Sequence, residues 1–253
     1  MLNVRVIPCL LLHNGGVVKT VKFKKPRYIG DPINVVKILN EKEVDELVFL
    51  DIDASKENRE PNYSIIEEIA NECFMPFAYG GGITTLAQAD RLFSLGVEKI
   101  IIGSEAIKNS DLIKVISQKY GSQSVVVSLN VKNNVFGKHK LYDPAKKNTV
   151  KTGVAAFSQL VEASGAGEIF LNSVDRDGTK IGFDGELIKS IAAAVNIPVT
   201  VCGGAGKLSD FQLAIKEFGA SAVSAGSLFV YHGKRDAVLV NYPRYETLQD
   251  LFQ

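Results

Sequence analysis

Uninterrupted apolar runs alternate along this chain with segments of mixed apolar and polar character. The runs at 100–102 (III) and 125–127 (VVV) are rich in β-branched residues and contain no polar alternation, which is typical of strands buried on both faces of a parallel sheet. Eight such runs are expected as strands, at about 4–9, 47–51, 76–79, 99–103, 124–130, 168–172, 198–202 and 222–226.

Amphipathic segments of helical length separate these runs. Asp31 and Pro32 supply an N-cap and a first-turn proline to the first helix, and Gly96 and Gly219 provide C-terminal stops for two later ones. Further helices are expected at about 62–72, 85–95, 110–119, 154–164, 184–194 and 207–218. Eight strand–helix repeats predict an α/β fold with one domain over residues 1–253, a (β/α)8 or TIM barrel. A doubly wound open sheet is the alternative.

A pair of glycine motifs repeats within the chain. Gly81 precedes Gly103 by 22 residues, and Gly203 precedes Gly226 by 23 residues. The two sets are offset by about 120 residues, close to half the chain. A half-barrel repeated twice explains this spacing and predicts a ligand site with approximate two-fold symmetry.

These glycines fall at the predicted carboxyl ends of strands, where ligands bind in a (β/α)8 barrel. Glycine lets backbone N–H groups approach an anion closely, and a following helix adds favourable partial charge. For one glycine pair a tight turn is the favoured interpretation, but two matched pairs at equivalent half-barrel positions favour phosphate binding. The candidate phosphate-binding residues are Gly82, Gly103, Ser104, Gly178, Gly204, Gly226 and Ser227.

Composition limits the classes of function. The chain has 29 Lys and Arg against 28 Asp and Glu, so it has no overall attraction for nucleic acid or an anionic membrane. Cys9, Cys73 and Cys202 lack metal-ligand spacing, so neither a metal site nor a cofactor is predicted. Few cysteines and an apolar N-terminal run too short to span a bilayer fit a reducing, cytoplasmic setting.

Six motifs carry a resemblance to a known family. They are IPCL at 7–10, GGVVK at 15–19, DELVFLD at 45–51, GGGI at 80–83, DRDGTK at 175–180 and GGAG at 203–206. Over essentially the whole chain, they resemble the cyclase subunit of imidazole glycerol phosphate synthase. The resemblance implies a barrel that receives ammonia from a glutaminase subunit at its N-terminal face. It also implies a substrate with two phosphates at the barrel mouth, where ring closure serves histidine biosynthesis.

The sequence departs from the family at both catalytic positions. The resemblance implies an aspartate at the end of the first strand and another at the end of the fifth, where this chain has Leu11 and Asn130. Gly103 also stands where the family typically has asparagine. Because an acid or base typically contributes about 10²–10⁴-fold, we expect cyclase activity to be lost or very weak. The alternative is substitution by another group, for which the candidates are His13, Asp51, Asp53, Asp175 and Asp177.

Arg5, Glu46, Lys99 and Glu168 match the family's salt-bridged ring that gates ammonia at the barrel base. Each begins a predicted strand, so we expect the four charges to meet and pair, because unpaired buried charges are costly. A purely structural ion cluster is the alternative interpretation.

One further expectation concerns the route of ammonia, and another concerns the loop after the first strand. A lumen containing Ala78, Ile101 and Val201 would suit neutral ammonia. Lys19 lies in a loop at about 13–31, which the resemblance implies is a mobile lid. A solvated loop lysine, or part of a patch that receives a partner protein, is the other interpretation.

These features leave three functions to consider. The first is a non-cyclising paralogue that conducts ammonia from a glutaminase, together with an ATP-dependent sugar amidotransferase. Such a complex converts acetamido to acetamidino sugars for surface polysaccharide, including lipopolysaccharide. The second is a genuine imidazole glycerol phosphate synthase cyclase that uses replacement acid and base residues. The third is an unrelated sugar-phosphate barrel, which the gate residues and the 175–180 motif argue against.

Overall fold

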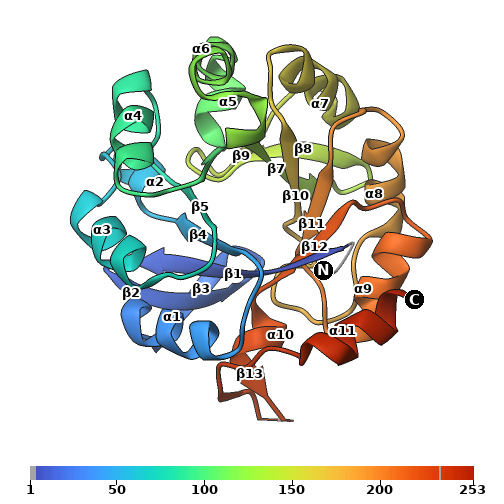
Figure 1. Ribbon diagram of the computed structural model, residues 1–253. Coiled ribbons are helices and arrows are strands. Elements are labelled where there is room, and N and C mark those ends of the chain that lie inside the picture. Colours follow the sequence, from blue (N-terminus) through green and yellow to red (C-terminus); the bar gives the residue numbers. More distant parts are fainter. Residues whose placement is uncertain (1–3, 234) are drawn as a thin grey trace.

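The computed structural model describes residues 4–233 and 235–253, and it forms a closed parallel barrel (Figure 1). Pairing of the last barrel strand with the first closes the ring. This confirms the predicted (β/α)8 barrel and excludes the open sheet. The barrel strands are β1 (Arg5–His13), β4 (Leu47–Asp51), β5 (Phe77–Gly80), β6 (Lys99–Ile102), β7 (Val125–Asn133), β10 (Glu168–Ser173), β11 (Val199–Cys202) and β12 (Ala222–Ala225).

Helices surround the strands as an outer layer (Figure 1). Asp31 caps the first of them by accepting the N–H of Asn34, and Pro32 occupies its first turn, as predicted. The main helices are α1 (Pro32–Glu41), α3 (Tyr63–Glu72), α4 (Leu86–Ser94), α6 (Asp111–Tyr120), α7 (Val154–Ala163), α8 (Gly185–Ala192), α9 (Leu208–Lys216) and α11 (Tyr245–Phe252). The shorter ones are α2 (Ala54–Glu57), α5 (Ser104–Lys108), α10 (Ser227–Val230) and a 3-10 turn at Ser122–Ser124. None of the helices in the described ranges is long and apolar enough to cross a membrane.

Two hairpins extend the barrel at its carboxyl end. β2 (Gly16–Val21) and β3 (Lys24–Gly30) follow β1, while β8 (His139–Asp143) and β9 (Asn148–Thr149) follow β7. The segment at 13–31 was expected to be a loop, and this was wrong because β2 pairs antiparallel with β1 and β3 pairs antiparallel with β2. A hairpin therefore follows the first strand of each half-barrel, in agreement with the predicted internal repeat. A smaller hairpin, β13 (Tyr231–His232) and β14 (Ala237–Val238), lies near the C-terminus.

Apolar side chains fill the barrel separately from the layer under the helices. The inner cluster includes Ile7, Val48, Val126, Phe170 and Ala222, and also Ala78 and Ile101 as predicted. Val201 was expected there, and this was wrong, since it packs in the outer layer. Side chains alternate along a strand, so its neighbours Thr200 and Cys202 face inward in its place.

Candidate functional site

Four charged side chains close the base of the barrel in a ring. The Arg5 guanidinium donates to Glu46 at 2.7 Å and to Glu168 at 2.9 Å, and the Lys99 ammonium lies 2.8 Å and 3.3 Å from the same two carboxylates. The pairing predicted from the sequence is confirmed. Thr200, which the sequence analysis did not single out, donates its hydroxyl to Glu168.

The ring favours its ionised form. Burial alone would raise the pKa of Glu168, but the charges of Arg5 and Lys99 outweigh it and lower this pKa below its usual value. Burial would likewise lower the pKa of Arg5, yet Glu168 and Glu46 raise it. The opposite charges at the barrel base therefore favour the charged forms of Glu168 and Arg5.

A cavity of about 420 Å³ occupies the opposite, carboxyl end of the barrel. This volume is within the range of small-molecule sites, which is about 300–1,000 Å³. Its lining includes six of the seven candidate phosphate-binding residues, namely Gly103, Ser104, Gly178, Gly204, Gly226 and Ser227. The seventh, Gly82, lies behind the lining with its N–H donating to Ser55 Oγ at 3.3 Å. The side chain of Ser104 already donates to Asp143 at 2.7 Å.

Lysines give this cavity a positive character. Seven of its described lining residues are lysines, whereas the acidic ones are Asp51 and Asp177. Arg59 neutralises Asp51 through two hydrogen bonds of 3.0 and 3.1 Å. Sequence reasoning noted the lysines near 19–25 but missed those contributed by other loops. A signal was available, since each follows a barrel strand or lies in the second hairpin. The seven are Lys19, Lys22, Lys24, Lys25, Lys56, Lys132 and Lys147.

Lys19 reaches from β2 into the cavity. Its side chain is buried, and its ammonium donates to the carbonyl of Cys9 at 3.0 Å. The ammonium lies directly over Gly226, where a Cβ atom would collide with it. The interpretation of Lys19 as a solvated loop lysine is therefore wrong, because the hairpin holds it inside the barrel mouth.

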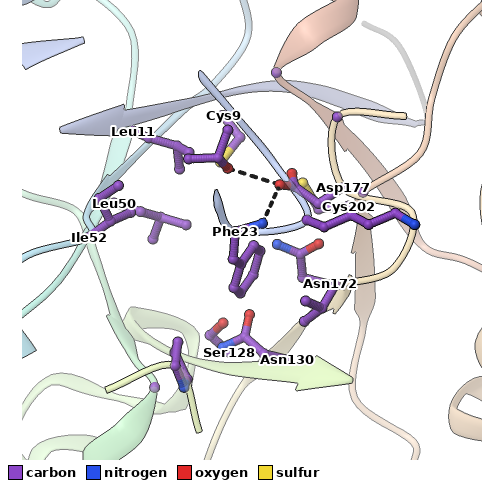
Figure 2. Close-up of a pocket in the computed structure, with 18 of the residues that line it drawn as sticks. Cys9, Leu11, Phe23, Leu50, Ile52, Ser128, Asn130, Asn172, Asp177 and Cys202 are labelled. Carbon is purple, nitrogen blue, oxygen red and sulfur yellow. Dashed lines mark hydrogen bonds between the residues drawn. The ribbon is translucent and has the colours of Figure 1, made fainter. Parts of the chain in front are cut away.

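Asp177 fastens this hairpin over the mouth. Its carboxylate accepts the hydroxyl of Thr20 at 2.9 Å and the N–H of Phe23 at 3.3 Å (Figure 2), and its carbonyl accepts the N–H of Lys22. Lys22 and Phe23 form the turn with positive φ angles of 53° and 60°, a conformation that favours glycine or asparagine. The contacts with Asp177 compensate for that strain. Burial raises the pKa of Asp177, against the opposing charge of Lys19.

Leu11 and Asn130, at the two positions where the family has aspartates, both line the cavity. They are 8% and 9% exposed. Strand β10, which pairs with β7, adds Asn172 to the lining. This residue was not predicted, because an asparagine at a strand end carries no distinctive motif. Figure 2 shows Leu11, Asn130 and Asn172 around the same opening.

The proposed replacement acids and bases are not all in this cavity. Asp53 pairs with His13 at 2.8 Å, and Asp175 accepts the N–H of Asn133 at 2.7 Å, so these three lie outside the described lining. Of the two carboxylates inside it, Asp51 is held by Arg59. Asp177 is the remaining candidate. Within the described residues no cluster of three or more His, Cys, Asp or Glu side chains could hold a metal ion.

Comparison with known proteins agrees with the barrel and its motifs. Residues 5–236 match the family described as "Histidine biosynthesis protein". The Pseudomonas aeruginosa protein named "Putative imidazole glycerol phosphate synthase subunit hisF2" is 53% identical over 243 residues, covering 96% of this chain and 97% of the relative. The "Putative imidazole glycerol phosphate synthase subunit HisF" of Leptospira interrogans is 50% identical over the full length of both chains. The "Imidazole glycerol phosphate synthase subunit HisF" of Endomicrobium trichonymphae is 43% identical, covering 91% of this chain and 88% of the relative. With the ring at the base and the glycine loops at the mouth, these similarities show that the chain belongs to the HisF family of imidazole glycerol phosphate synthase cyclase subunits.

Proposed function

We propose that this chain is the barrel subunit of a glutamine amidotransferase complex that conducts ammonia to an acceptor but has lost cyclase chemistry. The observation that carries the proposal is the contrast between the two ends of the barrel. The four-charge ring at the base is complete, whereas Leu11 and Asn130 offer no proton donor or acceptor for ring closure at the mouth.

The charged ring at the base of the barrel supports docking of a glutaminase subunit at the N-terminal face. The ring lies there, and the apolar inner cluster above it suits neutral ammonia better than ammonium. The names of the relatives describe subunits of a synthase, which is consistent with a partner. We propose that Lys99 and its three companions act as the entrance for ammonia.

The cavity at the barrel mouth supports binding of a phosphorylated ligand. Seven lysines and paired glycine loops surround the cavity, and such groups bind phosphate through charge and backbone N–H donors. Lys19 and its hairpin would close over that ligand. We propose that the acceptor is an acetamido sugar, which an ATP-dependent amidotransferase converts to an acetamidino sugar for bacterial surface polysaccharide.

A second candidate function is genuine cyclisation with Asp177 as the replacement acid and base. Its position in the cavity and its raised pKa favour this role. Its hydrogen bonds to Thr20 and Phe23 disfavour it, because they commit the carboxylate to holding the hairpin.

A cyclase assay with free ammonium separates the two functions. The purified chain receives the bis-phosphorylated substrate of imidazole glycerol phosphate synthase and an excess of ammonium chloride. With both catalytic groups absent, we expect turnover at least about 10⁴-fold below that of an ordinary family cyclase. Ordinary turnover that Asp177→Asn abolishes would instead establish the second candidate.

Docking of the glutaminase and conduction of ammonia are tested by a separate experiment. The chain is combined with a glutaminase subunit of an imidazole glycerol phosphate synthase, and complex formation and glutamine-dependent activity are measured with and without Lys99→Ala. If the ring is the entrance for ammonia, a complex should form, and Lys99→Ala should alter the coupling between the glutaminase and the barrel subunit. Absence of a complex, or unchanged glutamine-dependent activity in the variant, contradicts conduction.

A further inference from the structure

Two carboxamides stand side by side at the mouth of the barrel. Asn130 on β7 and Asn172 on β10 are register partners on neighbouring parallel strands. Both line the cavity, and Figure 2 shows both side chains pointing into it. A carboxamide offers a donor and an acceptor without carrying charge. The pair therefore presents a neutral hydrogen-bonding edge within a positively charged opening.

Asn172 is incompletely satisfied by the protein. It is 6% exposed, and its Oδ1 atom has no hydrogen-bond partner among the described residues. This oxygen lies over Gly203, 2.5 Å from where a Cβ atom would stand, and the amide nitrogen faces the cavity (Figure 2). Buried polar groups are nearly always paired. An unpaired one at a cavity wall indicates a ligand that completes the arrangement, either by accepting from the nitrogen or by donating to the oxygen after the amide turns over.

The walls around this pair are not uniform. Leu11, Leu50 and Ile52 form an apolar wall on the other side of the opening, and the Phe23 ring lies between the two walls (Figure 2). An aromatic face and an aliphatic wall fit the non-polar face of a sugar ring and a methyl group. The carboxamide pair fits a group that carries one N–H and one C=O.

The lysines define the remaining part of the ligand. Lys19 is buried over Gly226, and further lysines lie around the rim. Because Asp51 is already paired with Arg59, little negative charge opposes them. A phosphate or diphosphate group is the anion that such a rim favours.

We propose that the mouth itself binds a phosphorylated acetamido sugar, with Asn130 and Asn172 holding its amide and the lysines its phosphate. This rests on the proposed function and deepens it, since the acceptor of ammonia would be bound where the lumen opens. The neutral pair suits this ligand because an aspartate at either position could not donate to the amide carbonyl. Loss of the family's carboxylate at Asn130 thus creates a recognition site.

Calorimetric titration of the purified chain tests this inference directly. The probes are N-acetylglucosamine 1-phosphate, glucose 1-phosphate and inorganic phosphate. The two sugars differ in the acetamido group, so their ratio of dissociation constants measures its recognition. We expect the acetamido sugar to bind about tenfold more tightly than glucose 1-phosphate, as one net hydrogen bond provides, and more tightly than inorganic phosphate.

Variants assign that preference to the pair. Asn172→Leu is expected to reduce the tenfold ratio to about threefold or less, and Asn172→Asp, which keeps the side-chain shape, serves as a second variant if the first fails to fold. Lys147→Gln is the matched control, because it should weaken both sugar phosphates equally and leave their ratio unchanged. Equal binding of the two sugars by the unmodified chain, no binding, or a ratio that survives both Asn172 variants would overturn the inference. The proposed function is judged separately, by turnover with ammonium.

Discussion

Replacing Lys99 with alanine tests whether the ring at the barrel base is held together by its charges. Lys99 contacts both Glu46 and Glu168, whose side chains are 9% and 10% exposed. After the change, one arginine must neutralise two buried carboxylates. Removing one partner of a buried ion pair costs about 3–5 kcal/mol. Because the Lys99 side chain is 23% exposed and partly screened by water, we expect a loss of about 2–3 kcal/mol in the free energy of unfolding at pH 7.5.

The loss of unfolding free energy in Lys99→Ala should depend on pH in a defined direction. The folded-state pKa of Glu168 lies below its usual value, since the charges of Arg5 and Lys99 outweigh burial. Its contribution to stability is therefore complete above the unfolded pKa of about 4.3 and disappears as the pH falls through the folded pKa. The difference between the unmodified chain and Lys99→Ala should consequently be largest near neutrality and shrink below about pH 4.

Urea unfolding followed by circular dichroism is the appropriate assay, because the chain contains no tryptophan. Lys119→Ala provides the matched control, since Lys119 forms a 2.8 Å pair with Asp90 in which both side chains are largely exposed. That control should change stability far less than Lys99→Ala. The reasoning is refuted if the two variants are equally stable at pH 7.5, or if the Lys99→Ala deficit persists undiminished at pH 3.5.

Three further predictions concern the mouth. Gly226→Ala places a methyl group where the Lys19 ammonium lies, so inorganic phosphate should bind about tenfold more weakly by calorimetry, and unchanged affinity would contradict the placement. Asp177→Asn removes a charged acceptor from the β2–β3 hairpin, so trypsin should cleave the hairpin about tenfold faster, and equal cleavage would show that the carboxylate does not hold it. Leu11→Asp combined with Asn130→Asp should raise ammonium-dependent cyclisation at least about 10²-fold, and no gain would indicate that Gly103 or the hairpin also limits the reaction.

The barrel could be predicted from the sequence because its strands are buried on both faces. The run expected at 99–103, for example, appears as β6 at Lys99–Ile102. The β2–β3 hairpin could not be predicted, because β3 has the sequence KKPRYIG, with five exposed residues in succession. The hairpin forms because β1 extends past the barrel to His13 and pairs with β2, which in turn pairs with β3. Tertiary context therefore outweighed local propensity in that segment.

The same distinction applies to the site. The ring residues could be anticipated because each stands at or just before the start of a strand, and the closed barrel brings strand starts together. The lysines of the mouth come from separate elements, namely the β2–β3 hairpin, α2, β7 and the β8–β9 turn, and their convergence on one cavity is a property of the folded chain. Asn172 shows the limit most clearly, since its proposed role rests on a buried oxygen that has no partner in the described part of the chain, a feature that no residue pattern encodes.

The energetics of the two ends support a functional rather than a structural interpretation of the ring. A buried ion cluster is costly to break, yet well-packed apolar residues of similar volume often give equal or greater stability. The adjoining layer of this barrel, with Ile7, Val48 and Phe170, consists of such residues. Stability alone therefore gives no reason for four charges at the base, which favours the proposed entrance for ammonia over a purely structural ion cluster. At the mouth, Leu11 and Asn130 are buried and line a cavity, as the proposed retention of ligand binding without cyclase chemistry requires.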